Sequence, residues 1–292
     1  MIGFVGAGKV GVSLSAFFKA RCVDISGFYS KNISSAEYAA SLTDSKVLSL
    51  SELVNSSDII FVTVPDSVIA EIDLLLSDNF KEFLKDKILV HCSGALSSSE
   101  GFRLSGKICS CASIHPMMAF NSKTTDFENI QNCFYTVEGD ENALKTVQNL
   151  LTRLKLSFKR ISSENKAAYH LASVLNSNCM AALFYMGQRL LHECGFNETE
   201  SRLALSLLMK KNADNIGSCG VYDALTGPVI RNDAVTVSKH LQTLNQNDKK
   251  LYAMLSLKLS QIAKIKRPDT DYRELTALLN KEISDESNRG NI

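Results

Sequence analysis

The first eleven residues restrict the fold of this chain more than any other segment, because an apolar run leads straight into a glycine-rich turn. The run Ile2–Val5 is followed by glycines in the spacing G-x-G-x-x-G, and a helical pattern begins with the second of them. Such glycines permit a tight turn, close approach of the backbone to a pyrophosphate and close packing of helix on strand. The helix N-terminus also offers free N–H groups to phosphates. The segment therefore predicts a Rossmann domain that binds a dinucleotide through Gly6, Ala7, Gly8, Lys9, Val10 and Gly11.

The end of the second apolar run, Ile25–Tyr29, indicates which dinucleotide is preferred. NAD sites usually have Asp or Glu at this place, about 20 residues beyond the glycines, where the carboxylate holds the ribose hydroxyls. Here the chain continues with Ser30 and Lys31, which offer a hydroxyl and a cation to a 2′-phosphate. We therefore expect the cofactor to be NADP(H), with Tyr29, Ser30 and Lys31 among its contacts.

Short apolar runs alternate with helical patterns over the first half of the chain, which is typical of a parallel sheet covered by helices on both faces. The runs expected as strands are Ile2–Val5, Ile25–Tyr29, Lys46–Leu50, Asp58–Val64, Lys87–Cys92, Cys109–Ile114, Asn132–Glu138 and Phe158–Ser162. Only helical patterns follow, over residues 164–194, 198–216, 234–244, 248–264 and 272–286. We expect an α/β fold: a doubly wound, mostly parallel Rossmann domain over residues 1–162, then an all-α domain for substrate binding and dimerisation over residues 163–292.

The composition argues against several classes of partner. The 292 residues carry 32 Lys and Arg against 31 Asp and Glu, without a basic or acidic block, so neither nucleic acid nor an anionic membrane is expected as a partner. No apolar run approaches the roughly 20 residues of a spanning helix, and the first strand leaves no room for a signal peptide. The eight cysteines include no C-x-x-C pair, so no metal site is expected. These observations predict a cytoplasmic protein with reduced cysteines.

Three of the expected strands end in residues suited to a reaction site, because open α/β sheets bind ligands beyond the carboxyl ends of their strands. Val64, Pro65 and Asp66 follow the fourth strand and are expected to border the cofactor, although a helix cap is an equal alternative for Asp66. Ser93 follows the fifth strand, where nicotinamide and substrate should meet, and is expected to contact both. His115 follows the sixth strand before a proline, so it is expected to line the substrate unless it merely forms a turn.

The first helical pattern of the second half carries a polar stripe. With about 100° of turn per residue, Lys166, His170, Ser173 and Ser177 fall on one side of an otherwise apolar helix. Such a stripe is costly to bury unless it faces water or a ligand. We therefore expect Lys166 and His170 to be catalytic and Ser177 to bind substrate. The alternative is a solvated first-turn lysine and a hydrogen-bonded histidine at an interface.

A second cluster of unusual residues lies between two helical patterns, over residues 225–233. Gly227 and Pro228 indicate a loop, and Arg231 has the fork geometry that suits a carboxylate. An ion pair between Arg231 and Asp233 is the alternative. The density of glycine, proline and arginine in one loop favours a binding site for a small anionic substrate.

Taken together, these motifs resemble one known family, the Rossmann-like proteins with a DUF2520 helical domain. The similar stretches are 6–11, 64–66, 91–96, 113–116, 169–172 with 177–178, and 225–233, so the resemblance runs from about residue 2 to residue 265. It implies an NADP-dependent oxidoreductase with a C-terminal domain like that of 6-phosphogluconate dehydrogenase, and usually a homodimer through that domain. Some bacterial members resemble an alternative ketopantoate reductase of pantothenate synthesis.

The resulting hypothesis is hydride transfer from NADPH to the carbonyl carbon of a small 2-oxo acid, with ketopantoate the first choice of substrate. Lys166 would polarise the carbonyl and donate a proton, and His170 would orient it or relay the proton. Ser93 and His115 would hydrogen-bond the substrate, and Arg231 would clamp its carboxylate.

Several alternatives stay open at this stage. The wider superfamily often has an asparagine one turn after the lysine, where this chain has His170, so either Lys166 or His170 could donate the proton. Arg231 could serve its own site or that of a partner subunit. A reductase of imines such as pyrroline-5-carboxylate, and a non-enzymatic NADP(H)-binding regulator, are the competing functions.

Overall fold

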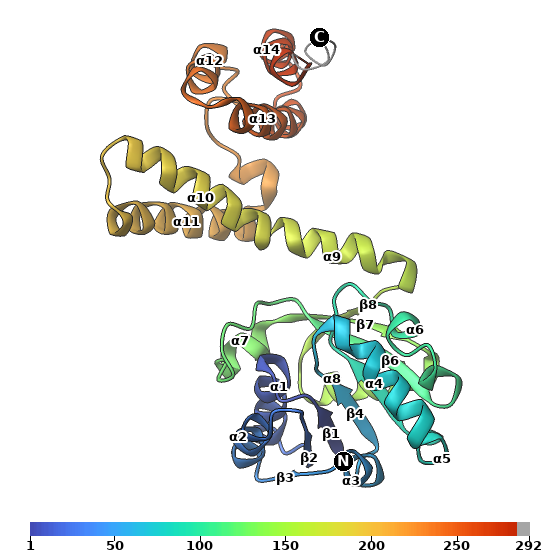
Figure 1. Ribbon diagram of the computed structural model, residues 1–292. Helices are drawn as coiled ribbons and strands as arrows, with labels where there is room; N and C mark the ends of the chain where they lie inside the picture. The colour runs from blue at the N-terminus through green and yellow to red at the C-terminus, as the bar shows by residue number, and fades with distance from the viewer. Residues whose placement is uncertain (285–292) are drawn as a thin grey trace, which may run out of the picture. The chain divides into compact units, whose positions relative to one another are not determined.

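A computed structural model describes residues 1–284 of the chain, which divide into two compact units, one from Met1 to Ser177 and one that begins at Asn178 (Figure 1). Residues 285–292, with the end of the last expected helix, lie outside the described part. The first unit contains the sheet, and the helices of the second unit follow it in the chain.

The sheet of the first unit has eight strands in the order β3-β2-β1-β4-β5-β6-β7-β8. Their bounds are β1 (Ile2–Val5), β2 (Ile25–Tyr29), β3 (Lys46–Val47), β4 (Ile59–Val62), β5 (Ile88–His91), β6 (Ser110–Pro116), β7 (Phe134–Gly139) and β8 (Ser157–Arg160). Neighbouring strands run parallel except at β6 and β7, which are antiparallel. This arrangement confirms the predicted doubly wound, mostly parallel α/β fold.

Helices cover both faces of the sheet because alternate strand residues point to opposite sides. On β1, Phe4 stacks on Phe28 and Phe61 in one core cluster, whereas Val5 belongs to a second cluster. The first cluster is closed by α1 (Lys9–Ala20), α2 (Ile33–Thr43), α7 (Phe127–Asn132) and α8 (Glu141–Arg153). The second is closed by α3 (Leu50–Ser56), α4 (Asp66–Asn79) and α5 (Lys81–Leu84). Short turns at α6 (Ser98–Gly101), η1 (Ser105–Lys107) and η2 (Ser163–Asn165) complete the unit.

The third strand is shorter than the expected run Lys46–Leu50. It ends at Val47, and the chain turns into helix α3, which the apolar pattern did not predict. A capping box explains the change: the Ser49 hydroxyl accepts from the N–H of Glu52, and the Glu52 carboxylate accepts from the N–H of Ser49. These two bonds stabilise the first turn of a helix.

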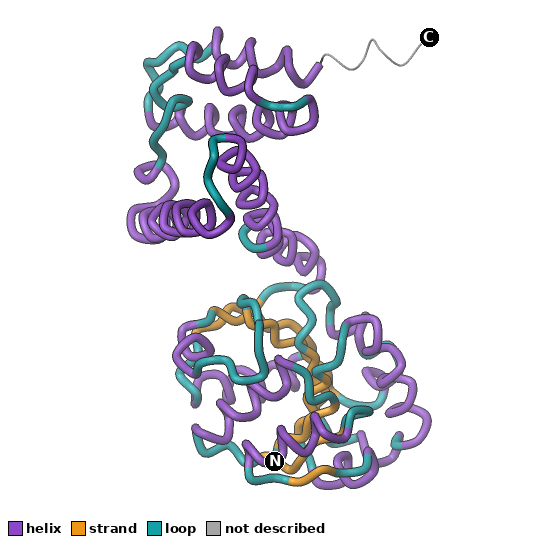
Figure 2. Tube along the Cα trace, turned by 60° about the vertical axis from the view of Figure 1, so that its left-hand side comes forward, coloured by secondary structure: helices purple, strands orange, loops and turns teal. Residues whose placement is uncertain are grey.

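The expected helix over residues 164–194 is divided in two. Helix α9 (Lys166–Leu175) ends before Asn176, and α10 (Asn178–Glu193) starts two residues later. Although the last strand ends at Arg160, near the expected boundary at residue 162, α9 belongs to the first unit, which extends to Ser177. Figure 2 shows the change from strands and helices to helices alone.

The second unit is helical throughout its described residues. Its helices are α10, α11 (Glu198–Ala224), α12 (Ala234–Thr243), α13 (Gln246–Lys266) and α14 (Arg273–Ser284). α11 extends beyond the expected end at residue 216 and is interrupted at Gly220, where φ is +79°. None of the helices in the described part of the chain combines the length and apolar content needed to cross a membrane.

Candidate active site

The turn between β1 and α1 opens onto a cavity of about 360 Å³ at the carboxyl end of the sheet. Gly6 has a φ of +100°, and a Cβ there would lie 2.9 Å from the carbonyl oxygen of Thr63, so only glycine fits this turn. A Cβ on Gly8 would meet one atom within 4 Å, the Thr63 oxygen at 3.7 Å, so this glycine leaves its side of the turn open. The backbone of Gly8 can therefore be approached closely by a ligand.

The N-terminus of α1 is suited to an anion. Gly8 is its N-cap, no side chain caps its first N–H groups, and no acidic residue occupies its first turn. Uncapped N–H groups at a helix start attract phosphate through hydrogen bonding and the helix dipole. The residues present thus fit the pyrophosphate of a dinucleotide.

A cationic region lies at another side of the same cavity, where β2 leads into α2. The Lys31 ammonium pairs with Glu71 at 2.8 Å, and this carboxylate raises the pKa of Lys31. The Lys123 ammonium donates to the Ser35 hydroxyl at 2.8 Å and also lines the cavity. Because two ammonium groups and the start of a helix meet here, this region can hold a phosphate on the ribose.

Sequence reasoning missed Lys123 and Ser35. Lys123 lies in the long connection between β6 and α7, 88 residues from Ser35, and no local pattern assigns it to β2. Ser35 could have been predicted from the helix cap, because Asn32 caps α2 by accepting a hydrogen bond from the N–H of Ser35. That cap places Ser35 at the start of the helix, beside Lys31.

The expected cofactor residues divide into those that line the cavity and those that do not. The lining residues are Gly6, Ala7, Gly8, Tyr29, Ser30, Lys31, Val64 and Pro65. Lys9 is exposed at the start of α1, and Val10 packs against the core. A Cβ on Gly11 would lie 2.4 Å from the Thr63 hydroxyl, so Gly11 brings α1 close to β4 rather than facing the cavity.

Asp66 and Ser93 connect the cavity to the ends of the next strands. The Ser93 hydroxyl donates to the Asp66 carboxylate at 2.6 Å, and it accepts from the N–H groups of Ala95 and Leu96. Asp66 follows Pro65, which lines the cavity, but neither Asp66 nor Ser93 is among the lining residues. Asp66 makes no side-chain cap to α4. The single proton of the Ser93 hydroxyl is thus directed at Asp66.

His91, at the end of β5, holds the loop that carries Ser93. Its Nδ1 accepts from the Ser93 N–H at 3.2 Å, so Nε2 carries the ring proton and donates to the Ser97 carbonyl at 3.1 Å. The ring is fully buried, and burial, followed by the charge of Lys166, lowers its pKa to about 4. His91 is therefore neutral near pH 7 and acts as a rigid link in this loop.

Lys166 begins α9 and is 2% exposed. Its ammonium donates to the Ser93 carbonyl at 2.9 Å and to the Ser113 hydroxyl at 2.7 Å. The Ser113 hydroxyl lies 3.3 Å from the Glu138 carboxylate, which partly balances the charge. Burial lowers the pKa of Lys166 to about 8, against the opposing effect of Glu138. Both hydrogen bonds tie α9 to the rest of the first unit, one to the loop after β5 and one to the middle of β6.

Two imidazoles meet over Gly94, one residue beyond Ser93. A Cβ on Gly94 would lie 2.7 Å from Nδ1 of His170 and 2.8 Å from Nε2 of His115. The other nitrogen of His115, Nδ1, is 2.7 Å from the Tyr169 hydroxyl. Nδ1 of His170 is buried and has no hydrogen-bond partner among the described residues. The structure therefore brings His115, His170 and Lys166 of the expected site together around the loop at Ser93.

Ser177 and Arg231 lie elsewhere in the chain. Ser177 is exposed after the end of α9, and its hydroxyl donates to the Ser173 carbonyl at 2.7 Å. Arg231 belongs to the second unit and is exposed in the loop between α11 and α12.

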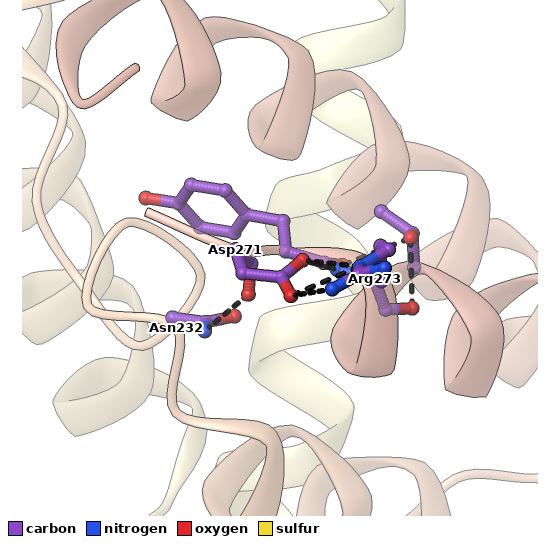
Figure 3. Close-up of polar contacts among 5 residues, drawn as sticks. Asn232, Asp271 and Arg273 are labelled. Carbon is purple, nitrogen blue, oxygen red and sulfur yellow. Dashed lines mark hydrogen bonds and ion pairs between the residues drawn. The ribbon is translucent and has the colours of Figure 1, made fainter. Parts of the chain in front are cut away.

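The loop of Arg231 is firmly held within the second unit. Asn232, with a φ of +57°, donates from Nδ2 to the Asp271 carbonyl at 2.8 Å, and the Tyr272 hydroxyl donates to the Ile230 carbonyl at 2.9 Å. Figure 3 shows Asn232 beside Asp271, which in turn binds Arg273. Asp233 caps α12 through the N–H of Thr236. These bonds fix the backbone of the loop and leave the Arg231 side chain exposed.

The sequence matches two family descriptions. Residues 1–116 match the Rossmann-like domain, and residues 133–259 match the domain of unknown function DUF2520. No protein of curated function matches the sequence.

Among solved structures, the crystal structure of protein TM1727 from Thermotoga maritima has 33% sequence identity and a TM-score of 0.75, over 91% of this chain and 100% of that chain. Pyrroline carboxylate reductase of Plasmodium falciparum with NADP bound has 16% identity and a TM-score of 0.58, over 91% and 96% of the chains. The imine reductase from Myxococcus stipitatus in complex with NADP+ has 16% identity and a TM-score of 0.59, over 98% and 95%. At these low identities, the two reductases share the fold.

Proposed function

Because this chain belongs to the family of proteins that join a Rossmann-like domain to a DUF2520 domain, we propose that it is an NADPH-dependent reductase of a small carbonyl compound. The observation that carries the proposal is the cavity at the glycine turn. It joins an uncapped helix N-terminus to a region with the ammonium groups of Lys31 and Lys123. A dinucleotide with an extra phosphate on its ribose matches both features.

NADP(H) is preferred over NAD(H) on this proposal, because the cavity presents cations where a carboxylate would hold an unmodified ribose. Lys31 and Lys123 would bind the 2′-phosphate, with Ser30 and Ser35 as hydroxyl donors. NADPH should bind at least tenfold more tightly than NADH, a difference of about 1.4 kcal/mol. Fluorescence titration of both cofactors tests this preference. Equal affinity for the two cofactors, or a preference for NADH, would refute the assignment of NADP(H).

The proposed substrate is a small 2-oxo acid, with ketopantoate as the first choice. NADPH supplies the hydride to the carbonyl carbon, and the carbonyl oxygen takes a proton to give the 2-hydroxy acid and NADP+. His170 is the preferred proton donor, because its Nδ1 has no hydrogen-bond partner within residues 1–284, while the Lys166 ammonium is held by Ser93 and Ser113. Lys166 would position the loop at Ser93.

A second candidate is reduction of a cyclic imine such as pyrroline-5-carboxylate. One observation favours it: burial lowers the pKa of His115 to about 4, so the imidazole of His115 beside Gly94 is neutral near pH 7. A neutral imidazole tolerates the positive charge of an iminium better than a protonated one would.

The deciding experiment measures NADPH oxidation with ketopantoate beside pyruvate, 2-oxoisovalerate and pyrroline-5-carboxylate. A clear preference for ketopantoate in kcat/KM, together with rescue of a pantothenate-requiring strain, supports the first choice. If pyrroline-5-carboxylate is the only one of these compounds that is reduced, imine reduction replaces the first choice as the proposed function. Tight binding of NADPH without turnover of any of the four compounds favours the non-enzymatic regulator.

We also propose that the protein forms a homodimer through its helical unit. The long helix α11 exposes Leu203 by 60% and Leu207 by 61%, one turn apart on the same side of the helix. Leucines exposed in such a row are typical of a surface that another subunit covers.

A further inference from the structure

The pair formed by Tyr169 and His115 is not part of the reaction scheme above. The Tyr169 hydroxyl is 2.7 Å from Nδ1 of His115, and the two rings meet edge to face with centroids 5.5 Å apart. Burial raises the pKa of Tyr169. Burial, followed by the charges of Lys166 and His170, lowers the pKa of His115 to about 4. Near pH 7 a neutral phenol therefore faces a neutral imidazole.

The hydrogen bond between these two neutral groups has a preferred direction. A phenolic O–H is a stronger donor than an imidazole N–H, and an unprotonated ring nitrogen is a stronger acceptor than a phenolic oxygen. Tyr169 therefore donates to Nδ1 of His115. Because a neutral imidazole carries one ring proton, that proton is left on Nε2.

Nε2 of His115 lies close to Gly94. It lies 2.8 Å from the place that a Cβ of residue 94 would take, and Nδ1 of His170 lies 2.7 Å from the same place. The two imidazoles are perpendicular, with centroids 6.2 Å apart, and come from β6 and α9. Buried polar nitrogens are normally hydrogen-bonded, yet Nδ1 of His170 has no partner among the described residues. A ligand atom near Gly94 would supply that partner.

We propose that Tyr169 is a positioning residue that sets the tautomer of His115, so that Nε2–H of His115 and Nδ1–H of His170 together donate to the carbonyl oxygen of the substrate beside Gly94. This inference rests on the proposed reductase function and adds the recognition of the reacting group. A neutral imidazole N–H can polarise a carbonyl without bringing a charge to it. Gly94 is required because any side chain at residue 94 would collide with both rings.

The charged groups around His115 support a neutral donor over a wide pH range. Lys166 and His170 on α9 oppose its protonation, and Asp66 at the start of α4 favours it, but burial is the largest effect. His115 thus stays neutral down to about pH 4, and its Nε2–H donor persists in neutral and mildly acidic solution.

The test reads the tautomer directly, in the full-length protein with and without NADPH. Nitrogen-15 NMR of the histidine rings reports which ring nitrogen carries the proton, and a His115→Gln variant assigns the signal. We expect His115 to carry its proton on Nε2, and a Tyr169→Phe variant to convert this signal to a mixture of tautomers. Tyr185→Phe, at a tyrosine that is 70% exposed, is the matched control and should leave the signal unchanged. A proton on Nδ1 in the unaltered protein, or an unchanged signal in Tyr169→Phe, would overturn the inference.

A kinetic arm separates this inference from the proposed function. With any substrate that the enzyme reduces, Tyr169→Phe should lower kcat at least about tenfold and leave the KM for NADPH unchanged. Gly94→Ala should lower turnover further while NADPH still binds, which also shows that the variant is folded. If none of the tested compounds is reduced, the reductase proposal fails while the NMR result still decides the tautomer. If Tyr169→Phe changes the tautomer and keeps full turnover, the positioning role is refuted.

Discussion

Two glycines of the same turn should respond to alanine in opposite ways. In Gly11→Ala, the new Cβ would lie 2.4 Å from the Thr63 hydroxyl and 2.7 Å from the Gly6 carbonyl. Comfortable contacts are about 3.5 Å or more, so Thr63 must move by about 1 Å. That movement breaks the bond from the Thr63 hydroxyl to the Gly6 carbonyl, which is 2.8 Å long.

The free energy of unfolding should fall by about 1–3 kcal/mol in Gly11→Ala. Overpacking of a tight site costs about 1–3 kcal/mol and the lost hydrogen bond about 1 kcal/mol. Alanine in place of glycine inside a helix returns about 1 kcal/mol. For a unit of this size, 1 kcal/mol corresponds to roughly 2–4 °C, so the Tm should decrease by about 2–12 °C.

Gly8→Ala is the matched control, because a Cβ at residue 8 meets only the Thr63 oxygen, at 3.7 Å. We expect its Tm to stay within about 3 °C of the unaltered protein. Its affinity for NADPH should fall at least about tenfold, since the methyl group enters the space that the phosphates need. Thermal melts followed by circular dichroism and a fluorescence titration with NADPH measure both quantities. The reasoning is refuted if Gly11→Ala has the same Tm as the unaltered protein, or if Gly8→Ala binds NADPH as tightly as the unaltered protein does.

Three further outcomes are expected. Lys123→Ala should weaken NADPH binding about tenfold while NADH binding stays constant, and equal losses for both cofactors in titrations would contradict a role at the 2′-phosphate. His91, with a pKa near 4 in the folded chain against 6.5 when free, is neutral in the fold and protonated in the unfolded chain at acidic pH. The neutral His91 therefore contributes about 3 kcal/mol to the free energy of unfolding above pH 6.5, and this contribution is lost as the pH falls towards 4. In urea titrations, His91→Gln should flatten the dependence of the unfolding free energy on pH. Leu207→Glu on α11 should convert the dimer to monomer in light scattering, whereas Val235→Glu, also at an exposed residue, should not; a dimer that survives Leu207→Glu would place the interface elsewhere.

Local patterns predicted the centre of the Rossmann domain well. The glycine spacing after β1 requires a particular turn, and alternating apolar residues determine which faces of a strand are buried. The antiparallel direction of β7 was not predictable in the same way, because a strand of either direction has the same alternation of residues. Helix α3, by contrast, could have been predicted, because Ser49 and Glu52 have the spacing of a capping box.

The reaction site was harder to predict than the fold, because its partners come from distant segments. The polar stripe on α9 predicted that Lys166 and His170 face water or a ligand, and the catalytic roles drawn from it stay predictions. The stripe could not show that the Lys166 ammonium is satisfied by Ser93 and Ser113, since these acceptors lie in the loop after β5 and in the middle of β6. In the sequence, Tyr169 stands out only as a member of the stretch 169–172 that resembles the family. Its bond to His115 depends on how α9 packs against β6.

The anchoring of α9 by Lys166 has a consequence for how such chains can be recombined during evolution. A gene fusion joined at residue 162 would retain all eight strands, yet Ser93 and Ser113 would lose the buried ammonium that α9 provides. Leaving a buried acceptor without its donor costs about 1–3 kcal/mol. We therefore expect exchange of the helical half to be tolerated better when the junction falls after α9 than when it falls at residue 162.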